Sequence, residues 1–371
     1  MNAERLPQRA ARFLHQQAHA VSSGHVTIGL DGFVDEIVTV VDKRESAAKF
    51  TRVPTIAAFG QRIARAAGKS SNIELVVERT KLGGNGPIMA NAMAAFGVQV
   101  DCVGCFGYPK THSVFAELAS RATIHSIAEP GHTDALEFED GKLMLGKQEM
   151  LKDVNWLSLV ERVGKDRLLA LFSGSNLVGL QGWTMLPSMN DIWQHVLAEL
   201  CPKLAPGKSR TIFFDLADPE KRDAKDIAHA LELIGQFQKF FVTYLGLNEK
   251  ESFEIGQVLG YHGVTEGEAA IKSVAEYILG ELDISAVVVH PREYALAASG
   301  DGVAKVTGPS VGKPTISTGG GDHFNAGFCL GKLIGADNEI ALQLGVGTSG
   351  YYVRDGKSPN VNELAEFLHS L

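Results

Sequence analysis

Three consecutive glycines near the C-terminal end of the chain, Gly319, Gly320 and Gly321, lead directly into Asp322. An apolar pattern with helical spacing follows, so we expect the glycines to lie where a helix begins. Glycine has no Cβ, and its backbone N–H groups can therefore approach a ligand closely. At a helix N-terminus, such groups form an anion-binding site that the helix dipole strengthens. The simpler alternative is a glycine-rich turn in which Asp322 caps the helix.

The composition fits a globular protein whose partners are small molecules. The chain has 371 residues, of which 45% are hydrophobic, and a formal net charge of −8. This charge argues against binding to nucleic acid or to an anionic membrane surface. Apolar runs are too short for a membrane span, and residues 1–21 lack the apolar core of a signal peptide. Cys102 and Cys105 lie in an apolar run without a zinc-type partner pair, so we expect buried thiols and a cytoplasmic protein.

Strands and helices alternate from about residue 150 onward, which predicts a parallel sheet with helices on both faces. Among the predicted strands are residues 168–172, 176–181, 210–215 and 240–247. Open sheets of this class bind ligands at the carboxyl ends of their strands. Asp31 and Asp35 follow an apolar strand near the N-terminus. They could accept hydrogen bonds from ligand hydroxyls, although turn chemistry alone would also explain them.

Several of these stretches resemble, in the same order, motifs of the ribokinase-like (PfkB) carbohydrate kinases. Residues 318–327 are similar to the family signature Thr-Gly-Ala-Gly-Asp-x-Phe-x-x-Gly, with Gly320 in place of alanine and His323 in place of a common threonine. In that family, the glycine loop holds the transferred phosphoryl group and the aspartate deprotonates a sugar hydroxyl. The resemblance implies these roles for the loop of residues 319–321 and for Asp322.

The resemblance also implies a sugar site in the first half of the chain. Residues 83–97 are similar to a family loop, Gly-Gly-x-x-x-Asn, that precedes an alanine-rich helix, although Ile88 stands where the asparagine is usual. The residues expected near the acceptor are Asp31, Asp35, Gly84, Asn85, Asn91 and Gln181.

A second set of residues is expected near the nucleotide. Asn248 and Glu251 match the Asn-x-x-Glu motif that organises Mg²⁺ in the family, through water, although this spacing more often caps a helix. His290, Arg292 and Tyr294 replace the family's usual nucleotide-side pattern, and the His-x-x-x-Tyr spacing looks like the ADP-dependent sugar kinases of the same superfamily. Gly347 lies in a glycine-rich helical stretch beside the nucleotide in the family. We expect Mg²⁺ and ATP, with ADP as the alternative phosphoryl donor.

The resemblance implies a three-layer αβα fold with a mostly parallel central sheet and a small β-sheet lid. We expect a single kinase domain over residues 1–371, with lid strands within about 36–45, 72–82 and 133–149. Such a lid would exclude water from the transferred group. Because lid-to-lid contacts are common in the family, a homodimer through the lid is expected.

The predicted function is that of a sugar kinase that phosphorylates a hydroxymethyl group. The alternatives are an ADP-dependent sugar kinase, a nucleoside kinase, a pyridoxal or hydroxymethylpyrimidine kinase, and a non-catalytic relative that binds a sugar or a nucleotide. A dehydrogenase is disfavoured, because the G-x-G-x-x-G of residues 345–350 follows a helical pattern rather than a strand.

Overall fold

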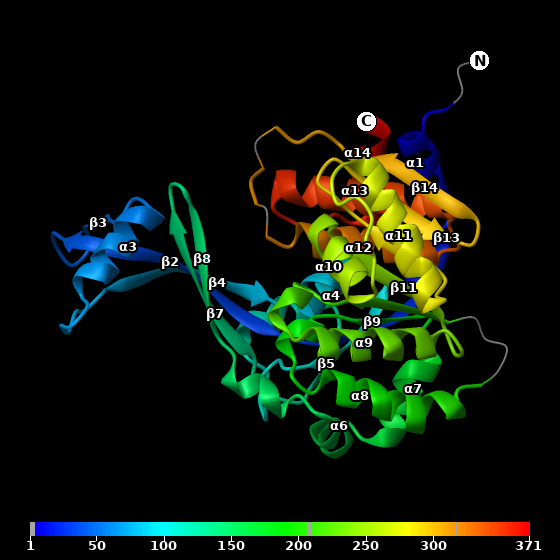
Figure 1. The fold of residues 1–371 in the computed structure, drawn as a ribbon, viewed down its shortest axis with the longest axis horizontal. Coiled ribbons are helices and arrows are strands. Elements are labelled where there is room, and N and C mark those ends of the chain that lie inside the picture. Colours follow the sequence, from blue (N-terminus) through cyan, green and yellow to red (C-terminus); the bar gives the residue numbers. More distant parts are fainter. Residues whose placement is uncertain (1–3, 206–209, 313, 317) are drawn as a thin grey trace.

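A mostly parallel central sheet organises the fold of the computed structural model, which describes residues 4–205, 210–312, 314–316 and 318–371. Within these residues the sheet has nine strands, and its last two are antiparallel additions at one edge. In spatial order the strands are β14 (Gly302–Thr307), β13 (Tyr294–Ser299), β12 (Ala286–Val289), β11 (Val242–Leu247), β10 (Thr211–Asp215), β9 (Leu177–Leu180), β1 (His25–Leu30), β5 (Gln99–Gly104) and β6 (Thr123–Ser126) (Figure 1).

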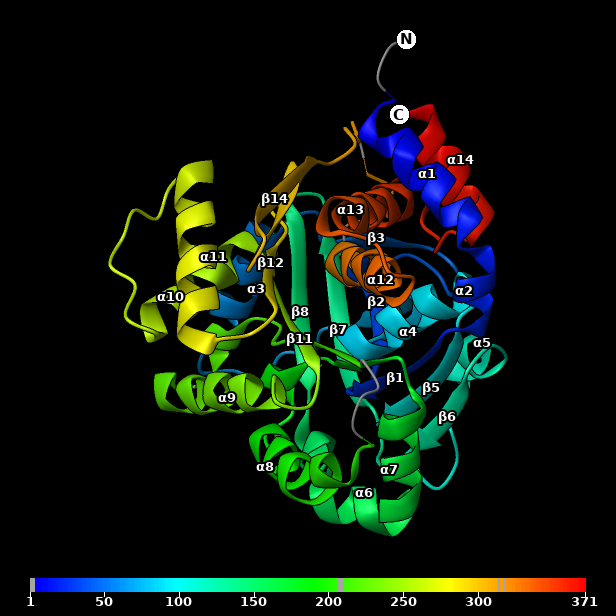
Figure 2. The same ribbon diagram turned by 90° about the vertical axis from the view of Figure 1, so that its right-hand side faces the viewer.

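Helices cover both faces of this sheet (Figure 2). One face packs against α1 (Leu6–Gln16), α2 (Ala18–Ser23), α4 (Asn85–Ala95), α5 (Ala116–Ala119), α12 (Gly320–Leu333), α13 (Asn338–Asp355) and α14 (Val361–Ser370). The other face packs against α6 (Trp156–Arg162), α7 (Lys165–Gly174), α8 (Met189–His195), α9 (Ala224–Phe237), α10 (Glu249–Val258) and α11 (Glu268–Leu282). Short 3-10 turns occupy Ser113–Phe115, Glu149–Asp153, Trp183–Met185, Cys201–Lys203 and Pro219–Lys221, and a π-helical turn, Val196–Leu200, extends α8.

The strands read as apolar runs because both of their faces are buried. In β10, Phe213 packs into one core, whereas its neighbours Ile212 and Phe214 pack into the core on the opposite face. In β12, Val287 and Val288 alternate in the same way. The predicted three-layer α/β architecture is therefore confirmed. None of the helices among the described residues combines the length and apolar character that a membrane crossing needs.

A second, smaller sheet projects from one side of the body (Figure 1). Its strands are β3 (Phe50–Arg52), β2 (Phe33–Arg44), β7 (Gly131–Phe138), β8 (Gly141–Lys147) and β4 (Leu75–Gly83), the last paired with β2. Helix α3 (Ile56–Arg65) belongs to a separate small core of this sheet, in which Phe59 packs with Val38 and Leu136. These strands overlap the residues expected to form a lid. The role of the small sheet as a lid stays a prediction.

One strand prediction was wrong. Residues 168–172 lie inside α7 rather than in a strand. The buried side chains of this helix are Leu168, Leu171 and Phe172, which recur at intervals of three and one and so line one helical face. The uninterrupted apolar run conceals that spacing, because Leu169 and Ala170 between them are apolar as well.

Helices α12 and α13 cross at very close range, and glycine makes the contact possible. A Cβ placed on Gly327 of α12 would lie 2.4 Å from Thr348 Oγ1 and 2.5 Å from the carbonyl oxygen of Leu344, both on α13. This packing fixes the position of α12, whose first turn carries the glycine–aspartate stretch.

We predict that Gly327→Ala lowers the free energy of unfolding by about 1–3 kcal/mol, because the added methyl group overpacks the contact between α12 and α13. Gly280→Ala is the matched control, since Gly280 lies within α11 with nothing within 4 Å of an added Cβ. This control should be stabilised by about 0.4–1 kcal/mol. Urea denaturation of both variants tests the prediction, and equal effects of the two substitutions would contradict it.

Candidate active site

The predicted anion site lies where α12 begins. Gly319 is the N-cap residue with φ +93°, and Gly320 and Gly321 form the first helical turn. The first N–H groups of a helix have no partner within the helix, so here they are available to a ligand. Gly320 and Gly321 line a cleft of about 580 Å³. The sequence prediction of a helix N-terminus at this glycine run is confirmed.

Asp322 is buried in the same helical turn. Burial, helped by the negative charges of Asp31 and Glu251, raises its pKa to about 7. Asn85 opposes this effect, because its Nδ2 donates a hydrogen bond to Asp322 Oδ1 over 2.8 Å. A carboxyl group with this pKa can accept a proton at neutral pH far more effectively than an exposed aspartate.

Asp31 fixes the loop that carries Asn85. Its two carboxylate oxygens accept hydrogen bonds from the main-chain N–H groups of Asn85 and Gly86, at 2.7 and 2.8 Å. Burial raises the pKa of Asp31 to about 6. The preceding Gly84 has φ +95°, and a Cβ on it would lie 2.9 Å from the Asp31 carboxylate. Asp31 thus organises the start of α4, with both of its oxygens engaged by the main chain.

The other residues expected near the acceptor are Asp35, Gln181 and Asn91. Asp35 is buried in β2, where burial raises its pKa and Lys81 opposes the shift. Gln181 follows β9 and is fully buried, yet neither of its side-chain amide atoms has a hydrogen-bond partner among the described residues. Asn91 Oδ1 also lacks a partner within that part of the chain. Because buried polar groups are normally hydrogen-bonded, these side chains suit a polar ligand.

The cleft beside the anion site has the size and position of a nucleotide pocket. His290 stacks against Phe324 with ring centroids 4.6 Å apart, and burial lowers the His290 pKa to about 4, so the ring is neutral. Besides Gly320 and Gly321, the lining residues are His290, Pro291, Arg292, Tyr294, Gly308, Pro309, Val311, Pro314, Ile316, Phe324, Val346, Ser349, Gly350 and Val353.

Gly347 is placed differently from the other residues expected near the nucleotide. A Cβ on Gly347 would lie 2.6 Å from Leu368 and 3.3 Å from Leu364, both on α14. This glycine therefore serves the packing of α13 against α14. Its neighbours Val346 and Gly350 line the cleft instead.

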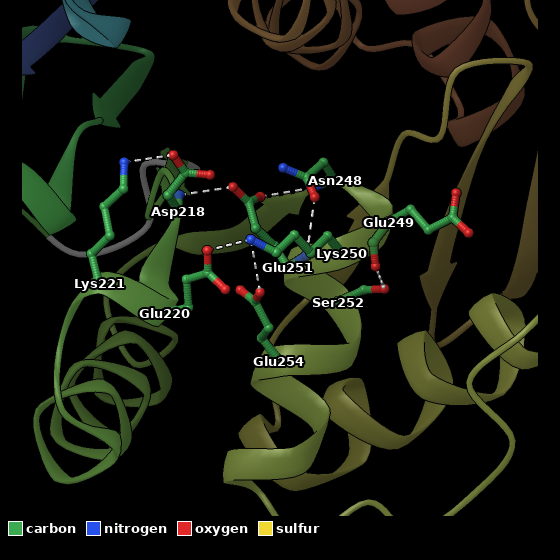
Figure 3. A network of polar contacts seen from close by, with 9 residues as sticks. All are labelled: Asp218, Glu220, Lys221, Asn248, Glu249, Lys250, Glu251, Ser252 and Glu254. Atoms are coloured by element: carbon green, nitrogen blue, oxygen red, sulfur yellow. Dashed lines mark hydrogen bonds and ion pairs between the residues drawn. The ribbon is translucent and has the colours of Figure 1, made fainter. Parts of the chain in front are cut away.

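Asn248 and Glu251 form a capping box at the start of α10 (Figure 3). Asn248 Oδ1 accepts from the Glu251 N–H at 3.0 Å, and Glu251 Oε2 accepts from the Asn248 N–H at 2.8 Å. Glu251 Oε1 accepts from the N–H of Asp218, at 2.9 Å. Asp218 and its neighbour Ala217 have φ of 55° and 59°, so Glu251 holds a strained turn in place. The capping alternative stated for this motif is thus realised.

Asp215 is a candidate that the sequence prediction did not include. It ends β10, and burial together with the charges of Glu251 and Asp322 raises its pKa well above the usual range. Asn325 Nδ2 on α12 donates to Asp215 Oδ2 at 2.6 Å. An acid at the carboxyl end of a buried strand was visible in the sequence, but its closeness to Asp322 depends on the sheet order. Three buried carboxyl groups therefore share one region.

His323 stabilises the glycine loop. Its Nδ1 lies 2.7 Å from the carbonyl oxygen of Gly319, and its Nε2 lies 2.8 Å from Ser358 Oγ. The ring stacks on Tyr352 with centroids 3.5 Å apart, and the Tyr352 hydroxyl donates to the carbonyl oxygen of Thr318. The departure from the family's threonine at this position thus has a structural role.

Comparison with known proteins agrees with this geometry. Residues 5–371 match the model of the prokaryotic ketohexokinase family. A curated ketohexokinase from Haloferax volcanii is 31% identical over 349 residues, which cover 94% of this chain and 91% of the relative.

Solved structures share the fold at lower identity. Arabidopsis thaliana ribokinase, complexed with ribose and ATP, has a TM-score of 0.65 and 15% identity over 94% of this chain and 99% of its own. Escherichia coli phosphofructokinase-2 has a TM-score of 0.64 and 13% identity, with the same coverage. The fold is therefore ribokinase-like. With the family match over nearly the whole chain, it follows that this protein belongs to the prokaryotic ketohexokinase family and is a carbohydrate kinase.

Proposed function

We propose that this kinase transfers the terminal phosphoryl group of ATP to a hydroxymethyl group of a ketohexose. The observation that carries the proposal is the buried Asp322 carboxyl, with a pKa of about 7, beside the N–H groups of residues 319–321. The ketohexose acceptor is suggested by the family and by the Haloferax volcanii relative. ATP as donor is suggested by the Arabidopsis ribokinase complex, with ADP as the alternative.

In this proposal, Asp322 accepts the proton of the attacking hydroxyl as its oxygen bonds to phosphorus. Asn85 orients the carboxylate through its hydrogen bond to Oδ1. The N–H groups at the start of α12 stabilise negative charge on the transferred oxygens, since they point at the group without having to reorganise. The alcohol and the phosphoryl group are thereby held in line, which supplies much of the catalysis in such transfers.

Asp35, Gln181 and Asn91 are the proposed acceptor-binding side chains. The unpartnered amide of Gln181 supports this role, because a sugar can both donate to its oxygen and accept from its nitrogen. Asp31 contributes indirectly through the loop that carries Gly84 and Asn85.

The acid cluster suits Mg²⁺. The charges of Glu251 and Asp322 raise the pKa of Asp215, and the charge of Glu251 also raises the pKa of Asp322. A hard divalent cation would relieve this repulsion. Among the described residues, no group of three His, Cys, Asp or Glu side chains could hold a metal directly. Asn248, Glu251 and Asp215 would therefore hold it through water and the donor's phosphates. When bound, Mg²⁺ neutralises phosphate charge during transfer.

On the nucleotide side, we propose that His290 and Arg292 contact the donor. The neutral His290 ring offers a stacking surface in the cleft, whereas Arg292 offers a charge for a phosphate. The small sheet is proposed to act as a lid that excludes water from the transferred group. The four cysteines are free and buried, which supports a cytoplasmic location.

We predict that Asp322→Asn lowers kcat by about a hundredfold or more, since the amide cannot accept the hydroxyl proton. Nucleotide affinity should be mostly retained. The measurement is turnover with Mg²⁺, ATP and fructose, with phosphorus NMR to identify the phosphorylated hydroxymethyl group, and with glucose and a nucleoside as alternative acceptors. Asp301→Asn, an exposed loop substitution, is the control. Undiminished turnover in Asp322→Asn would remove this residue from the mechanism.

The pH dependence of kcat/KM should follow the ionisation of Asp322. Because the base must be ionised, activity should decrease as the pH falls below about 7, by about tenfold per unit. Because the pKa of Asp322 is raised in the folded state, this group stabilises the fold most at low pH, and that contribution is lost as the pH rises through about 7. Protonation of Asp322 therefore does not unfold the protein, and the loss of activity at low pH reflects loss of the base. Circular dichroism across the same range provides the control. A flat profile down to pH 5 would contradict the assignment.

A homodimer through the small sheet is proposed because large apolar side chains are exposed on it. Five such residues are 42–50% exposed, namely Ile63, Leu75, Val77, Met144 and Leu145. Exposed apolar patches of this kind often mark interfaces.

We predict that the wild-type protein sediments as a dimer and that the double variant Leu75→Lys, Val77→Lys sediments as a monomer. The added charges would be desolvated without partners in the interface. Leu157→Lys, on exposed α6 of the body, is the matched control and should remain dimeric. A monomeric wild-type protein at micromolar concentration would refute the interface.

A further inference from the structure

The face of the small sheet that carries Asp35 also carries lysines. Asp35 of β2 pairs in register with Lys81 of β4 and Thr133 of β7. Glu137 lies four residues beyond Thr133 and pairs with Lys142 of β8. Since side chains alternate along a strand and paired residues share a face, all five lie on the same face as the proposed acceptor-binding acid.

Lys142 on this face has a hydroxyl rather than a carboxylate as its polar partner. Its Nζ donates to Thr318 Oγ1 over 2.9 Å, and no carboxylate among the described residues lies within 4.0 Å of it. Lys147 on the same strand is different, since it faces the other side and pairs with Asp134 over 2.9 Å. The ammonium of Lys142 is therefore free to exchange its weak partner for an anion.

The residue that Lys142 contacts, Thr318, lies at the edge of the anion site. Thr318 directly precedes Gly319, and its carbonyl oxygen accepts from the Tyr352 hydroxyl at 3.0 Å. Burial raises the pKa of Asp35, and the positive charge of Lys142 is among the effects that oppose this rise, so its field extends to the acceptor side. Lys142 thus lies between the N–H groups of α12 and the proposed acceptor site. In Figure 1 the hairpin of β7 and β8 stands on the side that faces the body.

We propose that Lys142 is a catalytic residue, whose ammonium leaves Thr318 Oγ1 and binds the phosphoryl group during its transfer. This inference rests on the proposed function. The acceptor oxygen forms a bond to phosphorus as the bond from phosphorus to the leaving oxygen of the nucleotide breaks. The hydroxyl proton passes to Asp322. Lys142 stays protonated throughout and stabilises negative charge on the transferred oxygens.

A lysine on the small sheet adds a full positive charge, which the main-chain amides lack. The amides at the start of α12 are dipoles fixed to the body, whereas Lys142 supplies a full charge from β8. Its contribution depends on the approach of the small sheet to the body. Efficient transfer is thereby coupled to closure over the acceptor.

The test compares Lys142→Met with Lys142→Arg and with Lys147→Met as the matched control on the same strand. We expect Lys142→Met to lower kcat with fructose and Mg²⁺–ATP by roughly tenfold or more, with KM for fructose within about threefold of wild type. Lys142→Arg, which keeps the charge, should retain at least about a third of kcat. Lys147→Met should match the wild type.

Calorimetric binding without acceptor provides an independent readout. Lys142→Met should bind ATP more weakly by roughly fivefold or more and bind ADP unchanged, because only ATP carries the phosphoryl group to be transferred. A merely structural lysine would not alter ATP and ADP binding differently. A kcat within about threefold of wild type for Lys142→Met, or an unchanged ATP affinity, would overturn the inference.

The two proposals fail in distinguishable ways. If the wild-type protein phosphorylates no ketohexose, the proposed function fails, and the comparison of ATP with ADP binding still tests Lys142. If the wild-type protein is active and Lys142→Met equals it, only the role of Lys142 is refuted.

Discussion

The arrangement of this site depends on one buried carboxyl group at the start of a helix. Asp322 has lost most of its hydration, and the neighbouring acids Asp31 and Glu251 add repulsion, so its pKa rises to about 7. The helix dipole and the hydrogen bond from Asn85 keep the ionised form accessible. This balance leaves a base that is poised near neutral pH, and the other parts of the site maintain it.

The central sheet brings these groups together. Asp31 follows β1, Asp215 ends β10 and Glu251 lies in the first turn of α10 after β11, so all three lie near the carboxyl ends of parallel strands. Helix α12 begins in the same region, and its position is fixed because Gly327 lets it pack closely on α13. The body thus contributes acids and main-chain dipoles. The small sheet contributes Lys81 and Lys142 on the face that carries Asp35.

The sequence predicted the three-layer fold and the glycine–aspartate turn because both depend on local patterns. Residues 168–172 were misassigned because an uninterrupted apolar run hides helical spacing. Asp215 was missed as a site residue because its closeness to Asp322 follows from the sheet order, which no local pattern gives. Gly347 was expected at the nucleotide, yet it serves helix packing, since the direction of a helical residue is set by tertiary contacts. The contact between Lys142 and Thr318 joins residues 176 positions apart and could not be read from the sequence.

The most direct test of this account is the ionisation of Asp322 itself. Infrared difference spectra between wild type and Asp322→Asn, recorded across pH, would isolate the carbonyl stretch of its protonated form. The account predicts that this band disappears with a midpoint near pH 7, as burial among like charges requires. A midpoint near the ordinary aspartate value of about 4 would show a solvated carboxylate and would contradict the account.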